Sequence, residues 1–226
     1  IDDGYAIQQR VIELTRVGAR RVGRKIGLTN PAVQNAFGVN TPDFGVLFAD
    51  MAYGDSEPIP ATRMLQPRVE AEVAFVLGRD LPEQPVTATD VLRATEFVVA
   101  AIEVVDSRIA GWDISILDTV ADNASSGTFV LGGAPRRLTD IDDLREVAME
   151  LACDGEVLSS GVGAQCLGHP VNAVVWLANA VGSRGAPLQA GEVILSGSLG
   201  PLVTVERGRT YEAAITGLGT VRATFA

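Results

Sequence analysis

The sequence predicts an α+β protein, a mixed, β-rich fold with short flanking helices. Apolar runs such as Phe97–Val105 have the length and the Val and Ile content of buried strands. The chain has 24 Gly residues and only 5 % aromatic residues, which indicates many turns and an aliphatic core. Strands predominate toward the C-terminus, where residues 192–225 predict several strands separated by Gly turns.

The first half of the chain predicts helices and strands on either side of a long loop. Residues 4–18 have apolar residues at helical spacing, and Asp3 stands where a cap would be. A strand at Lys25–Leu28 follows, and Asn30-Pro31 opens a short helix with Pro in its first turn. Residues 38–66 are rich in Gly, Pro and Asp and predict a loop, which at this length is often functional. Beyond the loop the pattern predicts a strand at Val69–Leu77, a helix at Thr87–Thr95 and a strand at Phe97–Val105.

The second half predicts a hairpin and an apolar helix. Asp154-Gly155 lies between two strand-like runs and is a strong hairpin signal. The helix at Pro170–Val181 follows His169, the only histidine, which we expect to cap that helix rather than to act in the site. Before the hairpin, the chain predicts a helix at Asp113–Val120, a loop at 122–127 and a strand at Thr128–Leu131.

Composition and charge argue against nucleic-acid and membrane partners and indicate a reducing compartment. The formal net charge is -10 and there is no basic stripe, so we expect no nucleic-acid partner. No apolar run reaches the ~18 residues of a membrane span, so we expect no membrane partner. Cys153 and Cys166 have no metal or redox spacing, which suits a reducing, cytoplasmic compartment. The chain begins at Ile1 without Met, so we expect further residues ahead of it.

Lys25 is the only lysine, against 17 arginines. An ammonium can lose its proton when it is buried or placed near another cation, whereas guanidinium in practice cannot. Lys25 lies in the apolar, glycine-flanked segment Gly23–Thr29. A single lysine in this setting indicates a site that needs an amine, although an arginine-biased composition explains it as well.

Three carboxylates interrupt apolar strands. Glu70 and Glu72 are two residues apart, so both side chains lie on one face of the predicted strand. Glu103 stands inside the apolar run 97–105, where a charge is seldom buried unless it is paired or bound to a metal. Oxygen ligands of this kind suit Mg²⁺ or Mn²⁺. Asp106 could share the site, but an Asp at a strand end is more typical of a turn or an ion pair.

Several motifs in order along the chain resemble the 2-keto-4-pentenoate hydratases of the fumarylacetoacetate hydrolase superfamily. The resemblance covers essentially all of residues 1–226, which would form a single hydratase- or decarboxylase-like catalytic domain. The motifs that carry it are Gly23–Thr29, Pro42–Leu47, Val69–Gly78, Asp122–Ser125, Gly168–Asn179 and Gly191–Ser198.

The resemblance implies a fold of the fumarylacetoacetate hydrolase C-terminal type and a role for each site residue. The Mg²⁺ or Mn²⁺ ligands would be Glu70, Glu72 and Glu103. The acid/base pair would be Lys25 and Asp43. The substrate carboxylate would lie near two serines, Ser125 and Ser196.

The implied reaction is hydration of 2-hydroxypenta-2,4-dienoate to 4-hydroxy-2-oxopentanoate in the breakdown of aromatic or steroid rings. A homo-oligomer, a pentamer or a decamer, and a downstream aldolase are the implied partners. Two alternatives stay open: a 4-oxalocrotonate-type decarboxylase, which is similar around the metal, and a non-catalytic subunit of an assembly. The segment Pro42-Asp43-Phe44-Gly45 fits the hydratases better, and the three acids with one amine argue against a non-catalytic role.

Overall fold

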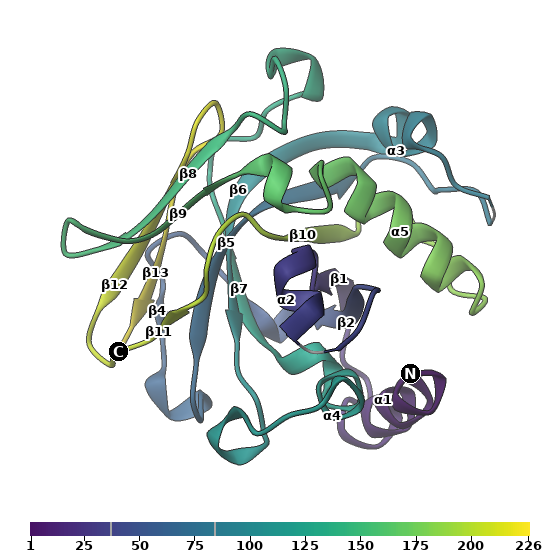
Figure 1. The fold of residues 1–226 in the computed structure, drawn as a ribbon, viewed down its shortest axis with the longest axis horizontal. Helices are drawn as coiled ribbons and strands as arrows, with labels where there is room; N and C mark the ends of the chain where they lie inside the picture. The colour runs from purple at the N-terminus through teal and green to yellow at the C-terminus, as the bar shows by residue number, and fades with distance from the viewer. Residues whose placement is uncertain (37, 84) are drawn as a thin grey trace.

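The structure of the protein, a computed structural model, describes residues 1–36, 38–83 and 85–226. Two β-sheets form its centre, and short helices cover them (Figure 1). The α-helices are α1 (Asp2–Thr15), α2 (Pro31–Ala36), α3 (Ala88–Ala94), α4 (Ile116–Ala121) and α5 (Pro170–Gly182). No helix in these described ranges combines the length and the apolar character that crossing a bilayer requires.

The larger sheet is mixed, with the strand order β2-β1-β10-β5-β6-β7-β3 and with β11 paired to β5. Its central pair, β5 with β6, is antiparallel, whereas β1 pairs with β10 in parallel. The strand β2 is therefore at one edge of this sheet. The strands are β1 (Arg21–Gly27), β2 (Asp43–Phe48), β3 (Ala52–Tyr53), β5 (Arg68–Leu77), β6 (Thr95–Val105), β7 (Ser126–Leu131), β10 (Val193–Ser198) and β11 (Val203–Thr204).

The smaller sheet has the order β4-β13-β12-β8-β9 and contains the predicted hairpin. Asp154 and Gly155 both have positive φ, as the tight turn between β8 and β9 requires. The C-terminal strands of this sheet lie away from α1 and the N-terminus (Figure 1). The strands are β4 (Pro58–Ile59), β8 (Ala148–Cys153), β9 (Glu156–Val162), β12 (Thr210–Ile215) and β13 (Gly219–Phe225).

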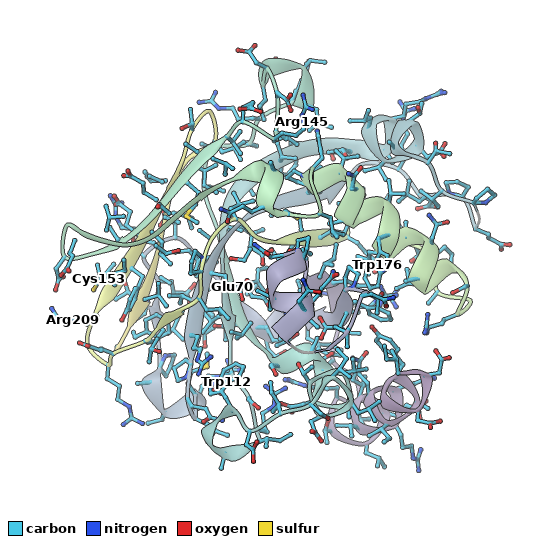
Figure 2. All side chains as sticks on the ribbon, in the orientation of Figure 1. Glu70, Trp112, Arg145, Cys153, Trp176 and Arg209 are labelled. Carbon is cyan, nitrogen blue, oxygen red and sulfur yellow. The ribbon has the colours of Figure 1, made fainter. Side chains whose placement is uncertain are left out.

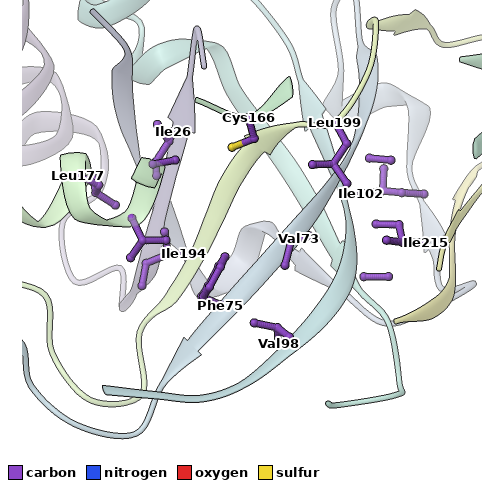
Figure 3. Close-up of a cluster of buried hydrophobic side chains, with 14 of the residues drawn as sticks. Ile26, Val73, Phe75, Val98, Ile102, Cys166, Leu177, Ile194, Leu199 and Ile215 are labelled. Carbon is purple, nitrogen blue, oxygen red and sulfur yellow. The ribbon is translucent and has the colours of Figure 1, made fainter. Parts of the chain in front are cut away.

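Alternation along the strands separates two faces of the larger sheet. Val73, Phe75 and Ile102 point into the main core, which also takes in side chains from α5 and the smaller sheet (Figure 3). The opposite face carries a smaller apolar cluster that includes Leu47 and Phe129. Because side chains alternate with a period of two, residues 70, 72 and 103 fall on this second face.

The structure confirms the predicted fold class and corrects two of the predicted elements. Residues 38–66 are not one loop, because Asp43–Phe48 forms β2 and pairs with β1. The Gly and Pro content of the segment favoured a loop, because the strand β2 is stabilised by pairing with β1, which lies earlier in the chain. Asp3 does not cap α1, since the helix begins one residue before it and its N-cap is Ile1. Asp2 and Asp3 instead lie in the first turn, where carboxylates favour the helix dipole.

Candidate active site

The three predicted acids meet on one face of the larger sheet. Glu70 of β5 lies directly opposite Glu103 of β6, and Glu72 follows two residues along β5. One carboxylate oxygen from each residue lies within 4.8 Å of the others. Glu72 and Glu103 are fully buried. Glu70 is half-buried and lies near the centre of the molecule (Figure 2). The acids therefore form a buried cluster, as the sequence predicts.

Lys25 joins this cluster from β1. Its Nζ lies 3.0 Å from Oε1 of Glu103, and both side chains are almost completely buried. Lys25 is level with Leu195 on β10, which in turn is level with Ala74 on β5. The parallel pairing of β1 with β10 thus brings the only lysine of the chain to the face that holds the acids.

Asp43 lies on the other side of Lys25, at the start of the edge strand β2. It pairs with Gly27, and its carboxylate lies over that glycine, where any Cβ would collide with Oδ1. The same Cβ position is 3.4 Å from Nζ of Lys25, so the acid and the amine share this space. Glycine at position 27 is therefore required for Asp43 to approach Lys25.

Burial raises the pKa of all three clustered acids, and repulsion by Glu103 adds to the rise for Glu70 and Glu72. Burial is the larger cause for Glu70, and the charge of Glu103 adds to it, so that the pKa of Glu70 rises to about 7. The pKa of Glu72 also rises well above its ordinary value, because this carboxylate is fully buried and faces Glu103 and Glu70. Burial also raises the pKa of Glu103, and the Lys25 ammonium opposes that rise. Such a cluster is unfavourable when fully ionised unless a further cation is present.

For both Lys25 and Asp43, burial and the neighbouring charges shift the pKa in opposite directions. Burial lowers the pKa of Lys25, but the carboxylates of Glu103, Asp43, Glu70 and Glu72 together raise it above its ordinary value. Burial raises the pKa of Asp43, and the charge of Lys25 partly reverses the rise. Without a metal, Lys25 is therefore the positive charge that balances the acids.

A divalent cation fits the donor set. In the described part of the chain, Oε1 of Glu72 and Oε2 of Glu103 are buried and have no hydrogen-bond partner. The second oxygen of Glu72 accepts the backbone N–H of Gly197 at 2.8 Å, which fixes the direction of the carboxylate. Buried oxygens without donors are ready ligands, and carboxylates suit hard cations such as Mg²⁺ and Mn²⁺.

The two predicted substrate serines lie on different elements, Ser196 on β10 and Ser125 in the turn after α4. Ser196 is on β10 and fully buried, and its hydroxyl has no partner among the described residues. Ser125 is also buried, and its hydroxyl lies 3.2 Å from the hydroxyl of Thr119. Sequence reasoning missed Ser198, which is level with Glu72 and interacts with the Glu70 carboxylate. The Ser-Gly-Ser run at 196–198 was the available signal, but an irregular pairing of β10 with β5 after Leu195 decides which serine faces the acids.

A strained turn follows α4 and packs against β2. Asn123, Ala124 and Ser125 all have φ between +50° and +55°, which costs of order 1–3 kcal/mol per residue. The Asn123 amide replaces a neighbouring strand: its Nδ2 donates to the carbonyl of Val46 at 2.9 Å, and its Oδ1 accepts the N–H of Val46 at 2.8 Å. Gly45 makes this close approach possible, since a Cβ there would collide with the carbonyl of Asn123. No local sequence signal marked Asn123 for this role.

The remaining candidates are structural. Asp106 accepts the backbone N–H groups of Leu65 and Gln66, so it holds a loop. His169 caps α5, where its Nδ1 accepts the N–H of Val171 at 3.0 Å. This confirms the expected cap.

Comparison with known proteins gives consistent results. The model of the fumarylacetoacetate (FAA) hydrolase C-terminal family matches residues 17–226. A 2-keto-4-pentenoate hydratase from Burkholderia vietnamiensis is 60 % identical over 98 % of this chain and 84 % of its own length. A 2-hydroxyhexa-2,4-dienoate hydratase from Comamonas testosteroni is 45 % identical over 97 % of this chain and 84 % of its own length.

A solved structure with a similar fold holds a metal. It is 4-oxalocrotonate decarboxylase from Pseudomonas putida G7, complexed with magnesium and adipate. The TM-score is 0.95 at 34 % sequence identity, over 100 % of this chain and 86 % of the other.

Removing one acid should weaken metal binding directly. Glu72→Gln keeps the shape of the side chain and removes one charge, so we expect the affinity for Mg²⁺ or Mn²⁺ to fall about tenfold or more. Titration calorimetry on the metal-free protein measures this without any substrate. Glu212→Gln, on β12 in an exposed ion pair with Arg222, is the matched control and should bind metal as the wild type does. Equal affinity in all three proteins would show that the cluster does not hold the ion.

Proposed function

The chain belongs to the fumarylacetoacetate hydrolase family, and we propose that it is a metal-dependent hydratase that converts 2-hydroxypenta-2,4-dienoate to 4-hydroxy-2-oxopentanoate. The observation that carries the proposal is the 3.0 Å contact between Lys25 and Glu103, which joins a proton-transfer group to the metal cluster. The names of the hydratase relatives from Burkholderia vietnamiensis and Comamonas testosteroni support the substrate class.

Each residue has a defined task in this reaction. Glu70, Glu72 and Glu103 hold the cation, which when bound stabilises negative charge on the 2-oxygen of the substrate. The substrate must lose its enol proton and gain a proton at C5, after which the oxygen of a water molecule bonds to C4 and a proton is delivered to C3. Lys25 and Asp43 lie together beside the cluster, and we assign these proton transfers to them.

Ser125 and Ser196 complete the proposed site as substrate-binding residues. Among the described residues, the buried hydroxyl of Ser196 has no hydrogen-bond partner, so it can donate to a carboxylate. Ser125 is held in the strained turn after α4, which packs on the strand that carries Asp43. Both assignments rest on the resemblance of their motifs to those of the family.

Decarboxylation is the second candidate. The observation that favours it is the TM-score of 0.95 to 4-oxalocrotonate decarboxylase, since the same metal could support loss of CO₂. The identity to that protein is 34 %, against 60 % to the hydratase from Burkholderia vietnamiensis. We therefore place hydration first.

The proposal also places the enzyme in a sequence of reactions and in a compartment. Its product would be a 4-hydroxy-2-oxo acid, which a retro-aldol cleavage consumes, so we propose a downstream aldolase as its partner. The free thiols of Cys153 and Cys166 suit the reducing cytoplasm.

A product assay tests hydration against decarboxylation. With Mg²⁺ or Mn²⁺, the protein should convert 2-hydroxypenta-2,4-dienoate to one enantiomer of 4-hydroxy-2-oxopentanoate, and excess chelator should abolish turnover. Chiral chromatography measures the product, and a CO₂ assay on 4-oxalocrotonate measures the alternative. Release of CO₂ without hydration would favour the decarboxylase, and absence of both activities would favour a non-catalytic subunit.

The role of Lys25 can be separated from its charge. Lys25→Arg keeps the positive charge next to Glu103, but it should lose the ~10²- to 10⁴-fold that a positioned acid/base supplies, measured as kcat. Arg21→Lys is the control, at an exposed arginine of the same strand that pairs with the buried Glu192. Borohydride with substrate should trap no adduct on the only lysine, because the metal already provides the electron sink. An adduct, or wild-type turnover by Lys25→Arg, would overturn the acid/base assignment.

We also propose that the chain forms a homo-oligomer, a pentamer or a decamer. Ile7, Val11 and Leu14 are exposed along one stripe of α1, an apolar surface that association would cover. Multi-angle light scattering at micromolar concentration should report a mass that is a multiple of 23.7 kDa. A single species of 23.7 kDa would refute the assembly.

A further inference from the structure

The edge strand β2, which carries Asp43, has its outer side covered by side chains rather than by another strand. An edge strand presents unpaired N–H and C=O groups, which need partners if they are buried. At Val46 these groups bond to the Asn123 amide. Two residues nearer Asp43, the outward groups of Phe44 bond to two side chains of α1.

Tyr5 and Gln8 hold both backbone groups of Phe44. The N–H of Phe44 donates to the hydroxyl of Tyr5 at 3.1 Å. Nε2 of Gln8 donates to the carbonyl of Phe44 at 3.1 Å and to the carbonyl of Val120 at 2.8 Å. Residues three apart on a helix share a face, so one turn of α1 supplies both contacts. The ring of Tyr5 also stacks on that of Phe44, with centroids 4.2 Å apart and planes 14° apart.

The helix that supplies these contacts is itself held in place. Arg184, just after α5, lies over the Tyr5 ring, with its guanidinium carbon 4.6 Å from the centroid. The same guanidinium forms an ion pair with Asp2 at 2.7 Å. Gly4 packs against Val120 of α4 at a distance that leaves little room for a Cβ. The position of Tyr5 is therefore fixed by Arg184, which contacts its ring, and by the close packing of the neighbouring Gly4 against α4.

Asp43 depends on its backbone for its placement. The backbone N–H groups of Gly27 and of Asp43 itself lower the pKa of its carboxyl group, and within the described residues Oδ1 has no hydrogen-bond partner. The N–H that Tyr5 holds belongs to the planar peptide group between Asp43 and Phe44. A displacement of β2 at that peptide group would move the Cα of Asp43, and with it the carboxylate that lies beside Lys25. Burial and the charge of Asp43 raise the pKa of Tyr5, as expected for a buried phenol close to that carboxylate.

We propose that Tyr5 and Gln8 are positioning residues, which hold Asp43 against Lys25 through the peptide groups on either side of Phe44. The inference rests on the proposed function, since that function gives Asp43 its role in proton transfer. Both residues precede the region 17–226 that the family model matches. We call the contacts of Tyr5 and Gln8 with Phe44 the brace. The helix α1 supplies it from outside the region that the family model matches.

The test removes the two contacts one at a time. Tyr5→Phe keeps the ring stacking but removes the acceptor, and Gln8→Met keeps the size but removes the donor. Each should lower kcat about tenfold, because small displacements of catalytic groups are costly, while KM and the affinity for Mg²⁺ stay within about twofold. Matched controls are Tyr53→Phe, whose hydroxyl accepts only from Arg63 in the described contacts, and Gln9→Met, on the outer face of α1. Both controls should keep wild-type kcat.

The outcomes separate this inference from the proposed function. Asp43→Asn is measured alongside, with the melting temperature of every variant, and all assays are run well below the lowest of these temperatures. If Asp43→Asn loses activity while folded Tyr5→Phe and Gln8→Met keep wild-type kcat, the brace is structural only and the inference is wrong. If Asp43→Asn itself keeps wild-type kcat, the proposed role of Asp43 is wrong and the inference falls with it. A fall in kcat for both brace variants, with unchanged KM, supports positioning.

Discussion

Three carboxylates and one ammonium are buried together on one face of an otherwise apolar sheet, and the rest of the structure accommodates this constraint. Burying like charges is costly unless a cation compensates them, and Lys25 supplies only one positive charge against Glu70, Glu72 and Glu103. The raised pKa of each acid expresses that cost. The cluster is thus built to gain stability from a divalent ion.

The mixed topology of the larger sheet brings these groups together. Glu70 and Glu103 face each other through the antiparallel pair of β5 and β6, two strands that are consecutive in the chain. Lys25 lies on β1, and β10 stands between β1 and the strand β5 that carries Glu70 and Glu72. The strand β10 comes from much later in the chain, at Val193–Ser198. That strand also supplies the N–H of Gly197 that orients Glu72. The acid cluster, Lys25 and Asp43 are therefore parts of one sheet, and strain or slippage in β10 would affect the acids and Lys25 together.

At the edge of the sheet, the outward backbone groups of β2 need hydrogen-bond partners. Asp43 lies on a strand with only one neighbouring strand, so side chains from α1 and from the turn at Asn123 replace the missing one. Side chains can do this at chosen backbone groups without adding a further strand to the sheet. Such a replacement leaves little trace in sequence: Tyr5 and Gln8 look like ordinary helix residues, and Asp43–Phe48 looks like part of a Gly- and Pro-rich loop.

The sequence by itself determined the chemistry of the protein and most of its local structure. Alternation placed Glu70 and Glu72 on one face, the apolar run around Glu103 marked it as buried, and a single lysine stood out by composition. Only the tertiary structure decided that Lys25 pairs with Glu103, that Ser198 rather than Ser196 is level with Glu72, and that side chains of α1 bond to the backbone of the strand that carries Asp43. Periodicity is a property of neighbouring residues, whereas strand order, register and edge contacts join segments far apart in the chain and depend on how the whole core packs.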